Sequence, residues 1–262
     1  MTASRAHAAL ALSPHPDDEL LGCPAHLFAL RDAGWRVVNV ALTLGSERES
    51  RPRRRAELEA ACRDAGFELV LAPEGLMDGA SAAPFVRRLA AGTDASVLVA
   101  PSPHDDHPRH EQAGRLALAC LAAGVTRRLW LWGLWADVAL PTSLCLFDER
   151  RLAQIEAALA HHGGELERND YRRLLRARAH ATAVLAPERV FRYGAPGLAA
   201  DEYAEALCEL GLRDDGEVAL CAPALFDAAA YDPEPAASGQ GAAWLALPSP
   251  RRQAEGERPP HN

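Results

Sequence analysis

The chain has 262 residues, 48% of them hydrophobic, and a formal net charge of −8, which suits a soluble globular core and argues against a nucleic-acid-binding protein. All 28 basic side chains are arginine, so no lysine can serve as a Schiff base, a phosphate ligand or a general base. Six cysteines without a C-x-x-C pair indicate reduced thiols, and no run has membrane-spanning length. Residues 1–12 are too short for a secretion signal, so we expect a cytoplasmic protein.

Short apolar runs alternate with amphipathic segments along the first half of the chain. The patterns predict strands at Ala8–Leu12, Trp35–Leu44, Phe67–Leu71, Ser96–Ala100 and Arg128–Trp135, and helices at Asp17–Ala33, Arg54–Ala65, Pro84–Ala91 and Glu111–Ala123. Strands that alternate with helices through short links predict an α/β fold. We expect a Rossmann-like, mostly parallel sheet with helices on both faces.

The second half of the chain is predicted to extend this fold. The patterns predict helices at Glu149–His162, Asp170–Leu185 and Leu198–Leu210, and strands at Arg189–Tyr193 and Glu217–Cys221. We therefore expect a Rossmann-like core over residues 1–135 and a C-terminal α/β part over 136–232 that completes the pocket. The Pro/Ala-rich tail, 233–262, is expected to be partly disordered or to lie over the surface.

Two polar stretches follow directly after predicted strands. Residues 13–19 read Ser-Pro-His-Pro-Asp-Asp-Glu, and residues 103–108 read Pro-His-Asp-Asp-His-Pro. In parallel sheets ligands bind beyond the carboxyl ends of the strands, near a switch in strand order. We therefore expect the two distant stretches to meet at one rim and to share a divalent metal ion.

The residue types fit a catalytic metal centre. Zinc in such centres takes about three protein ligands and keeps a position open for water. His15 and Asp18 are three residues apart on a turn that enters a helix, so both can face the same way, and His107 completes the set. This donor set suits Zn²⁺, although Fe²⁺, Mn²⁺ or Co²⁺ would also fit.

The remaining polar residues can supply proton transfer. Asp17, next to a ligand, is the natural base for the attacking water. His104 is placed to stabilise an oxyanion or to protonate a leaving amine, and Asp106 could orient its ring.

Each stretch alone has a simpler explanation. Carboxylates at a helix start, as at Asp17–Glu19, usually compensate the helix dipole, and a single H-x-x-H pattern often arises by chance. We expect His26 and His180 to be structural and His110 to face water beside the site. The joint placement of the two stretches at matching strand ends is what favours a metal site.

The two stretches resemble motifs of the LmbE-like, or PIG-L, family of zinc-dependent deacetylases. The family's (A/P)HPDDE motif is matched by Pro14–Glu19, and its H-P-D-H motif by His104-Asp105-Asp106-His107, with Asp105 in place of proline. Thr43-Leu44-Gly45, Arg54 with Glu57-Leu58, and Tyr171–Ala179 followed by Pro187–Phe191 are also similar, so the resemblance covers most of residues 8–195.

The resemblance implies a Rossmann-like fold and hydrolysis of an N-acetyl group from an amino sugar. It implies metal ligands at His15, Asp18 and His107, a base at Asp17, an acid or oxyanion contact at His104 held by Asp106, and substrate contacts at Arg54 and Asp78. Two positions depart from the family. Ser102 stands where some members carry a tyrosine, and the H-S-Q segment appears only as His162-Gly163-Gly164.

For the substrate, the sequence predicts only a chemical class. We expect a small, soluble amino-sugar glycoside and neither nucleic acid nor a membrane as partner; a homo-oligomer would be compatible with the sequence. The Ala/Arg-rich composition suggests a high-GC bacterium and specialised metabolism. Residues 162–174 and 188–195 resemble deacetylases of aminoglycoside pseudodisaccharides.

Three other functions compete with deacetylation. An amidase would cut larger acyl or cysteinyl amides of amino-sugar thiol conjugates. A metal-dependent phosphoesterase would need extra carboxylates to bridge two ions about 3.5–4 Å apart. A non-catalytic sugar-binding relative would have no reason to keep Asp17 and His104.

Overall fold

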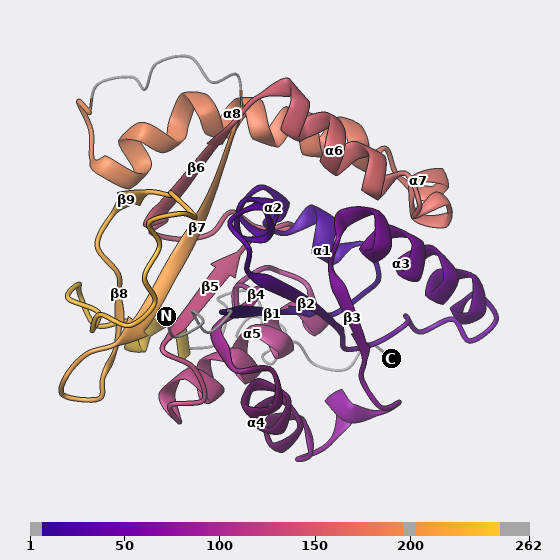
Figure 1. Ribbon diagram of the computed structural model, residues 1–262, viewed down its shortest axis with the longest axis horizontal. Coiled ribbons are helices and arrows are strands. Elements are labelled where there is room, and N and C mark those ends of the chain that lie inside the picture. The colour runs from indigo at the N-terminus through magenta and orange to yellow at the C-terminus, as the bar shows by residue number, and fades with distance from the viewer. Residues whose placement is uncertain (1–6, 196–202, 247–262) are drawn as a thin grey trace, which may run out of the picture.

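The computed structural model describes residues 7–195 and 203–246, and strands form its centre (Figure 1). The strands are β1 (Ala8–Ser13), β2 (Arg36–Ala41), β3 (Glu68–Leu71), β4 (Ala95–Pro101), β5 (Arg128–Trp132), β6 (Ser143–Phe147), β7 (Tyr203–Leu212), β8 (Val218–Leu220) and β9 (Ala224–Leu225). They form one sheet in the order β3-β2-β1-β4-β5-β7-β6-β9, with β8 paired to β7.

The strand order reverses between β1 and β4. Strands β3, β2, β1, β4 and β5 are all parallel, whereas β7 pairs antiparallel with β5 and with β6. The chain runs outward from β1 to β3, then returns to place β4 on the other side of β1. In open α/β sheets such a switch point creates a crevice at the carboxyl ends of the strands. The two polar stretches follow β1 and β4, and this arrangement confirms the Rossmann-like α/β prediction.

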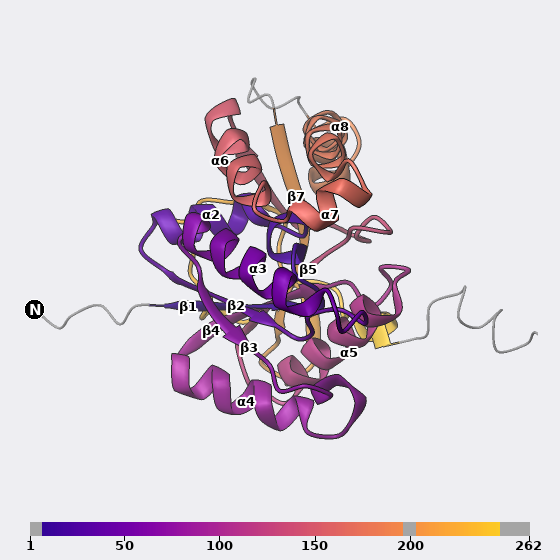
Figure 2. The ribbon, with the colours of Figure 1, turned by 90° about the vertical axis from the view of Figure 1, so that its right-hand side faces the viewer.

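Helices cover both faces of the sheet (Figure 2). They are α1 (Asp18–Leu21), α2 (Pro24–Asp32), α3 (Arg51–Ala65), α4 (Ala82–Thr93), α5 (Pro108–Ala122), α6 (Glu149–Leu159), α7 (Gly163–Arg168) and α8 (Tyr171–Phe191), with 3-10 turns at Leu76–Asp78 and Ala243–Ala246. One core lies between the sheet and α2, α3, α6 and α8, and another between the sheet and α4 and α5. Within the described ranges, no helix combines the length and the apolar character that crossing a membrane would need.

The predicted helix Asp17–Ala33 is wrong as one element, because it is two helices. Helix α1 ends at Gly22, and α2 begins with Pro24 in its first turn. A Cβ atom on Gly22 would lie 2.5 Å from Trp132 Cε2, so only glycine allows the indole to approach this turn. The break sets α2 against the sheet independently of the short helix that carries Asp18.

The second half departs further from the prediction. The predicted strand Arg189–Tyr193 is wrong, because its first three residues end α8, where Val190 packs against Leu144 and Ala204. The predicted helix Leu198–Leu210 is also wrong over its described residues, because they belong to β7, which lies between β5 and β6. Ala, Leu and Glu favour helices, but sheet pairing on both sides overrides that local preference. Strand β6 was not predicted.

Part of the predicted tail is packed. Gly241 pairs with Ala219, and Leu245 is buried in the core that contains residues of α4 and α5. Residues 247–262 lie outside the described residues. The sheet is continuous across residue 135, and the boundaries of the three predicted parts stay a prediction.

Candidate metal centre

In the turn after β1, carboxylate side chains accept hydrogen bonds from backbone N–H groups of the same turn. Asp18 Oδ2 accepts a hydrogen bond from the backbone N–H of His15 at 2.8 Å, so the side chains of both residues face the same side of the turn. Asp17 adopts φ 110°, which is strained for a residue other than glycine. Its backbone N–H donates to Glu19 Oε2 at 3.0 Å. The turn is therefore built to hold Asp17 and Asp18 in fixed, buried positions.

The turn after β4 is organised by Asp105, a residue without a predicted role. Its buried carboxylate accepts hydrogen bonds from the backbone N–H groups of Leu134, Trp135 and Ala136 at 2.6, 3.1 and 3.3 Å. The other oxygen, Oδ2, lies 2.6 Å from His110 Nδ1. A carboxylate on one ring nitrogen fixes the orientation of a histidine and directs the second nitrogen elsewhere.

Three imidazoles from the two turns meet at this rim. One ring nitrogen from each of His15, His107 and His110 lies within 4.8 Å of the others. The ring centroids are 4.9 Å apart for His15 and His107, 5.4 Å for His15 and His110, and 4.7 Å for His107 and His110. Asp18 joins them, with Oδ1 3.3 Å from His110 Nε2 and Oδ2 3.3 Å from His15 Nδ1. This donor set of imidazoles and one carboxylate fits a divalent transition metal.

The ionisable groups of the site shift one another strongly. Burial raises the pKa of Asp17 well above its usual range, and the charges of Asp18 and Glu19 raise it further. Burial would also raise the pKa of Asp18, but the charge and hydrogen bond of His110 lower it. Burial disfavours the charged form of His110, yet Asp18 and Asp105 raise its pKa to about 10. The site therefore favours positive charge between two carboxylates, where a metal ion can replace a proton.

A cavity of about 790 Å³ opens onto this cluster, with His15 and His107 in its wall. Arg54 and Asp78, the two residues implied as substrate contacts, also line it. Arg54 Nη2 lies 3.2 Å from the carbonyl oxygen of Pro16 and 3.1 Å from Glu165 Oε1, and Asp78 Oδ1 accepts from Arg109 Nη1 at 2.8 Å. The volume lies in the usual range for small-molecule sites, about 300–1,000 Å³.

Residues 10–121 match the family model described as PIG-L: GlcNAc-PI de-N-acetylase. This match confirms the resemblance to the PIG-L, or LmbE-like, family over these residues. The matched range contains both turns of the metal centre and the residues that connect them. No curated protein matches the chain.

Several solved structures share the fold of most of the chain. The conserved protein TT1542 from Thermus thermophilus is 24% identical with a TM-score of 0.60, over 76% of this chain and 92% of that one. The N,N'-diacetylchitobiose deacetylase from Pyrococcus horikoshii is 18% identical with a TM-score of 0.58, over 79% and 84%. The 4-carboxy-2-hydroxymuconate hydratase GalB from Pseudomonas putida is 16% identical with a TM-score of 0.60, over 78% and 95%.

The structure places His110 inside the site, which differs from the prediction made from the sequence. We expected this residue to face water, but it is 1% exposed and belongs to the imidazole cluster. The family's H-P-D-H motif matches His104–His107 and His107–His110 equally well, with three of four letters each. The second alignment contains the sequence signal for His110, because it puts His107 at the N-cap of α5 and His110 one turn later.

His104 and Asp106 lie on the same turn, outside the imidazole cluster. The His104 ring lies 6.0 Å, between centroids, from the Trp244 ring of the C-terminal segment. Its backbone N–H donates to the hydroxyl of Ser102, the residue at the family's tyrosine position, at 3.2 Å. Asp106 is exposed and has φ 61°. The predicted acid role of His104, held by Asp106, stays a prediction.

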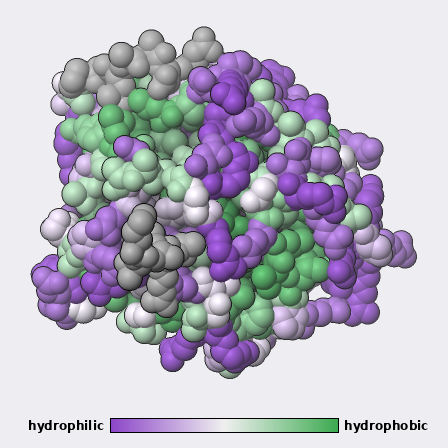
Figure 3. Space-filling view, in the orientation of Figure 1, coloured by the Kyte–Doolittle hydropathy of each residue, from purple (hydrophilic) through white to green (hydrophobic). Residues whose placement is uncertain are grey.

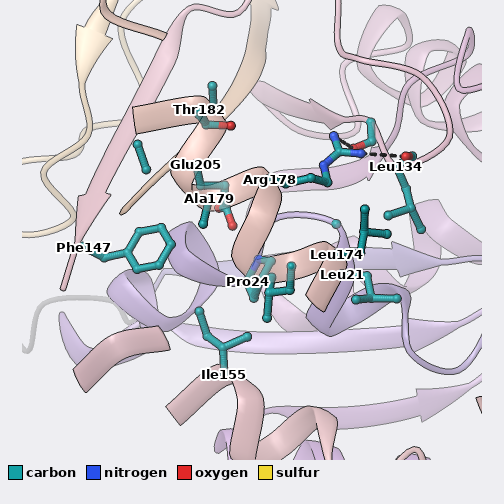
Figure 4. Close-up of a pocket in the computed structure, with 15 residues that line it drawn as sticks. Leu21, Pro24, Leu134, Phe147, Ile155, Leu174, Arg178, Ala179, Thr182 and Glu205 are labelled. Carbon is teal, nitrogen blue, oxygen red and sulfur yellow. Dashed lines mark hydrogen bonds between the residues drawn. The ribbon is translucent and has the colours of Figure 1, made fainter. Parts of the chain in front are cut away.

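Helix α8 braces this side of the metal centre. Arg178 donates from Nη1 to the carbonyl oxygen of Leu134 at 2.6 Å and from Nη2 to that of Gly133 at 2.7 Å (Figure 4). Leu134 is also one of the residues whose N–H groups hold Asp105. The cavity beside Arg178 has only about 50 Å³ and is no candidate for substrate binding.

Proposed function

We propose that the chain is a metal-dependent hydrolase that removes the N-acetyl group from an N-acetylglucosamine-type amino sugar in a small glycoside. The observation that carries the proposal is the imidazole cluster with Asp18, next to buried Asp17, at the switch point of a PIG-L domain. Similarity to a structure described as an N,N'-diacetylchitobiose deacetylase supports the substrate class. Specialised bacterial metabolism, with an aminoglycoside pseudodisaccharide as one candidate substrate, is part of the same proposal.

The donor set supports Zn²⁺, with Fe²⁺, Mn²⁺ or Co²⁺ as alternatives. When bound, such an ion would act as a Lewis acid toward the amide carbonyl and make water more acidic. Asp17 is the base that takes the proton of the attacking water. Its raised pKa, caused first by burial and then by Asp18 and Glu19, makes it a stronger base than an exposed carboxylate.

The geometry suggests different roles for the three histidines. A metal ligand is usually buried and oriented through its second ring nitrogen, as His110 is by Asp105. A proton donor must reach the substrate, and His107 is half-buried in the wall of the large cavity. We therefore propose His15, Asp18 and His110 as ligands and His107 as the acid. The sequence-based assignment, with His107 as third ligand and His104 as acid, is the alternative.

Two variants separate these assignments. His110→Ala should lose bound metal, measured by elemental analysis after gel filtration, because a ligand is gone. His107→Ala should keep the metal and lose about 10²–10⁴-fold in turnover, the usual contribution of a general acid. The reverse pattern would support the sequence-based assignment and return the acid role to His104.

The proposed activity is tested with a panel of N-acetylated amino sugars and their glycosides. Acetate and free amine should appear in equal amounts, stop after treatment with a chelator and return with added Zn²⁺. Release of a larger acid in place of acetate would indicate the amidase alternative. Release of phosphate from phosphate esters, without acetate, would indicate the phosphoesterase. No product from any of them would refute the hydrolase.

A further inference from the structure

The cavity that opens onto the metal centre has a positively charged wall. Five of its 21 lining residues are arginines, roughly one in four, whereas the whole chain has 28 basic residues in 262, roughly one in nine. Among the residues that the structure describes, only two carboxylates, Glu74 and Asp78, line the same cavity. Because the chain as a whole has a net charge of −8, the cavity has the opposite sign from the protein around it. Such a local field attracts anions into a cleft.

The arginines of the wall differ in whether their guanidinium groups already have partners in the protein. Arg54 is engaged by Glu165 and the carbonyl oxygen of Pro16, and Arg55 donates to Glu59 one turn further along α3 at 2.8 Å. These two guanidinium groups have partners that hold them in place. They do not account for the remaining positive charge of the wall.

The positive charges of Arg48 and Arg51 are only weakly compensated by neighbouring groups. Arg48 forms no side-chain hydrogen bond or ion pair within residues 7–195 and 203–246. The hydrogen bond and charge of Arg51 lower the pKa of Glu74, and the charge of Arg48 lowers it slightly further. Arg51 Nη1 lies 2.6 Å from Glu74 Oε1, and its Nε donates to the carbonyl oxygen of Gly45 at 3.1 Å. The Glu74 side chain is 74% exposed, so this ion pair contributes little and a bound anion can replace it.

Arg109 extends the positive wall from a second element, the first turn of α5. Its ion pair with Asp78, at 2.8 Å, is also solvent-exposed on both sides. Arg109 lies two residues after His107, which lines the same cavity. The positively charged wall is therefore continuous with the metal centre.

We propose that the substrate carries an oxyanion, a phosphate or carboxylate group attached to the amino sugar, which binds to Arg48 and Arg51 with Arg109 nearby. This inference rests on the proposed deacetylation, because it places the amide at His15 and His107 in the same cavity. A guanidinium group matches both oxyanions through two parallel hydrogen bonds. The cavity volume of about 790 Å³ leaves room for a sugar and a charged substituent.

The test compares neutral and anionic sugars on the metal-loaded full chain. Titration calorimetry measures the affinity for N-acetylglucosamine, for its 1-phosphate and 6-phosphate, and for N-acetylmuramic acid, which carries a carboxylate. At least one anionic sugar should bind about tenfold or more tightly than the neutral one at low salt, because it gains charge-assisted hydrogen bonds. Whether the phosphates or the carboxylate bind best identifies the oxyanion.

Variants then locate the anion. Arg48→Gln combined with Arg51→Gln should reduce the preference for the anionic sugar at least tenfold, and added salt should reduce it in the unaltered enzyme. The matched control is Arg88→Gln, an exposed arginine of α4 that does not line the cavity and should leave the preference unchanged. Thermal melts of all variants show whether each is folded.

The outcomes separate this inference from the proposed function. Equal affinity for neutral and anionic sugars overturns the inference, and so does an anion preference that survives the double substitution, because the anion then lies elsewhere, for example on the metal. Acetate release is followed in parallel. If acetate is released from neutral and anionic sugars alike and the two bind equally well, the deacetylase proposal holds and the oxyanion site is refuted. Arginine-dependent anion binding without acetate release leaves the oxyanion site standing and refutes the deacetylase.

Discussion

Two histidine–carboxylate pairs lie in different parts of the molecule and have the same local geometry. At the rim of the sheet, His110 Nδ1 lies 2.6 Å from Asp105 Oδ2. Between α2 and the antiparallel strands, His26 Nδ1 lies 2.6 Å from Glu205 Oε1. Both imidazoles are almost completely buried. The pairs differ in what the second ring nitrogen faces.

The second nitrogen decides what each pair can do. His110 Nε2 faces Asp18 in a cluster that opens onto the large cavity, whereas His26 Nε2 lies 3.1 Å from the buried hydroxyl of Ser143. Ser143, His26 and Glu205 together resemble a nucleophile triad, but a nucleophile must reach its substrate, and the neighbouring cavity has only about 50 Å³. Glu205 also accepts the backbone N–H groups of Ala25 and His26, at the start of α2. This pair anchors a helix, whereas the rim pair directs the second nitrogen of His110 toward Asp18.

Polar surface alone does not mark the rim. Figure 3 shows hydrophilic residues gathered on the right-hand side of the molecule, where Figure 1 places α3 and α7. Most of the exposed arginines and carboxylates of α3 form ordinary surface pairs, such as Arg55 with Glu59. What distinguishes the metal centre is that its charged groups are buried together at the end of two strands.

Among Asp17→Asn, Asp105→Asn and Ser143→Ala, the largest effect is expected for Asp17→Asn, and it is an effect on turnover. Asparagine keeps the size of the side chain but cannot take a proton from water, so turnover should fall at least about 100-fold. Bound metal should stay unchanged, because the substitution leaves His15, Asp18 and His110 in place. Steady-state kinetics with elemental analysis checks both. Unchanged turnover would remove Asp17 as the base and leave the rim without one.

A smaller effect is expected for Asp105→Asn. The amide replaces one carboxylate oxygen by a group that cannot accept a hydrogen bond, so His110 loses either its orientation or the loop that supports it. Metal affinity, measured by competition with a chelating dye, should fall about 10–100-fold, as for other partners of metal-bound histidines. Glu205→Gln is the matched control in the second pair and should leave metal affinity unchanged. A fall of equal size in both variants would show that neither pair is specific to the metal.

The sequence predicted the positions of the two turns because their signals are local. Polar residues that follow a buried strand and precede a helix lie at the rim of a parallel sheet whatever the rest of the chain does. The meeting of His15 with His107 followed from strand order alone. The prediction failed for His110. Two overlapping segments, 104–107 and 107–110, share His107 and match the H-P-D-H motif equally well, so letter matches alone cannot decide between them.

Other parts of the site depend on contacts that no local pattern carries. Asp105 is held by backbone N–H groups of residues 134–136, about thirty positions later, and any loop offers such groups. Arg178 is one arginine of many on an Arg-rich helix, and its role comes from packing α8 against the loop at Gly133. Strand β7 has helix-favouring residues and becomes a strand because β5 and β6 lie on both sides of it.

The smallest effect is expected for Ser143→Ala, and it tests the difference between the two pairs most directly. The substitution removes the hydroxyl group that faces His26 Nε2 and leaves the rest of the side chain in place. The free energy of unfolding should fall by about 1 kcal/mol, the net contribution of one hydrogen bond, as measured by urea denaturation. Acetate release should be the same as in the unaltered enzyme, because Ser143 is buried away from the cavity that contains His15 and His107. Loss of turnover without loss of stability would mean that this hydroxyl reacts, and the buried pair would then be a second active site.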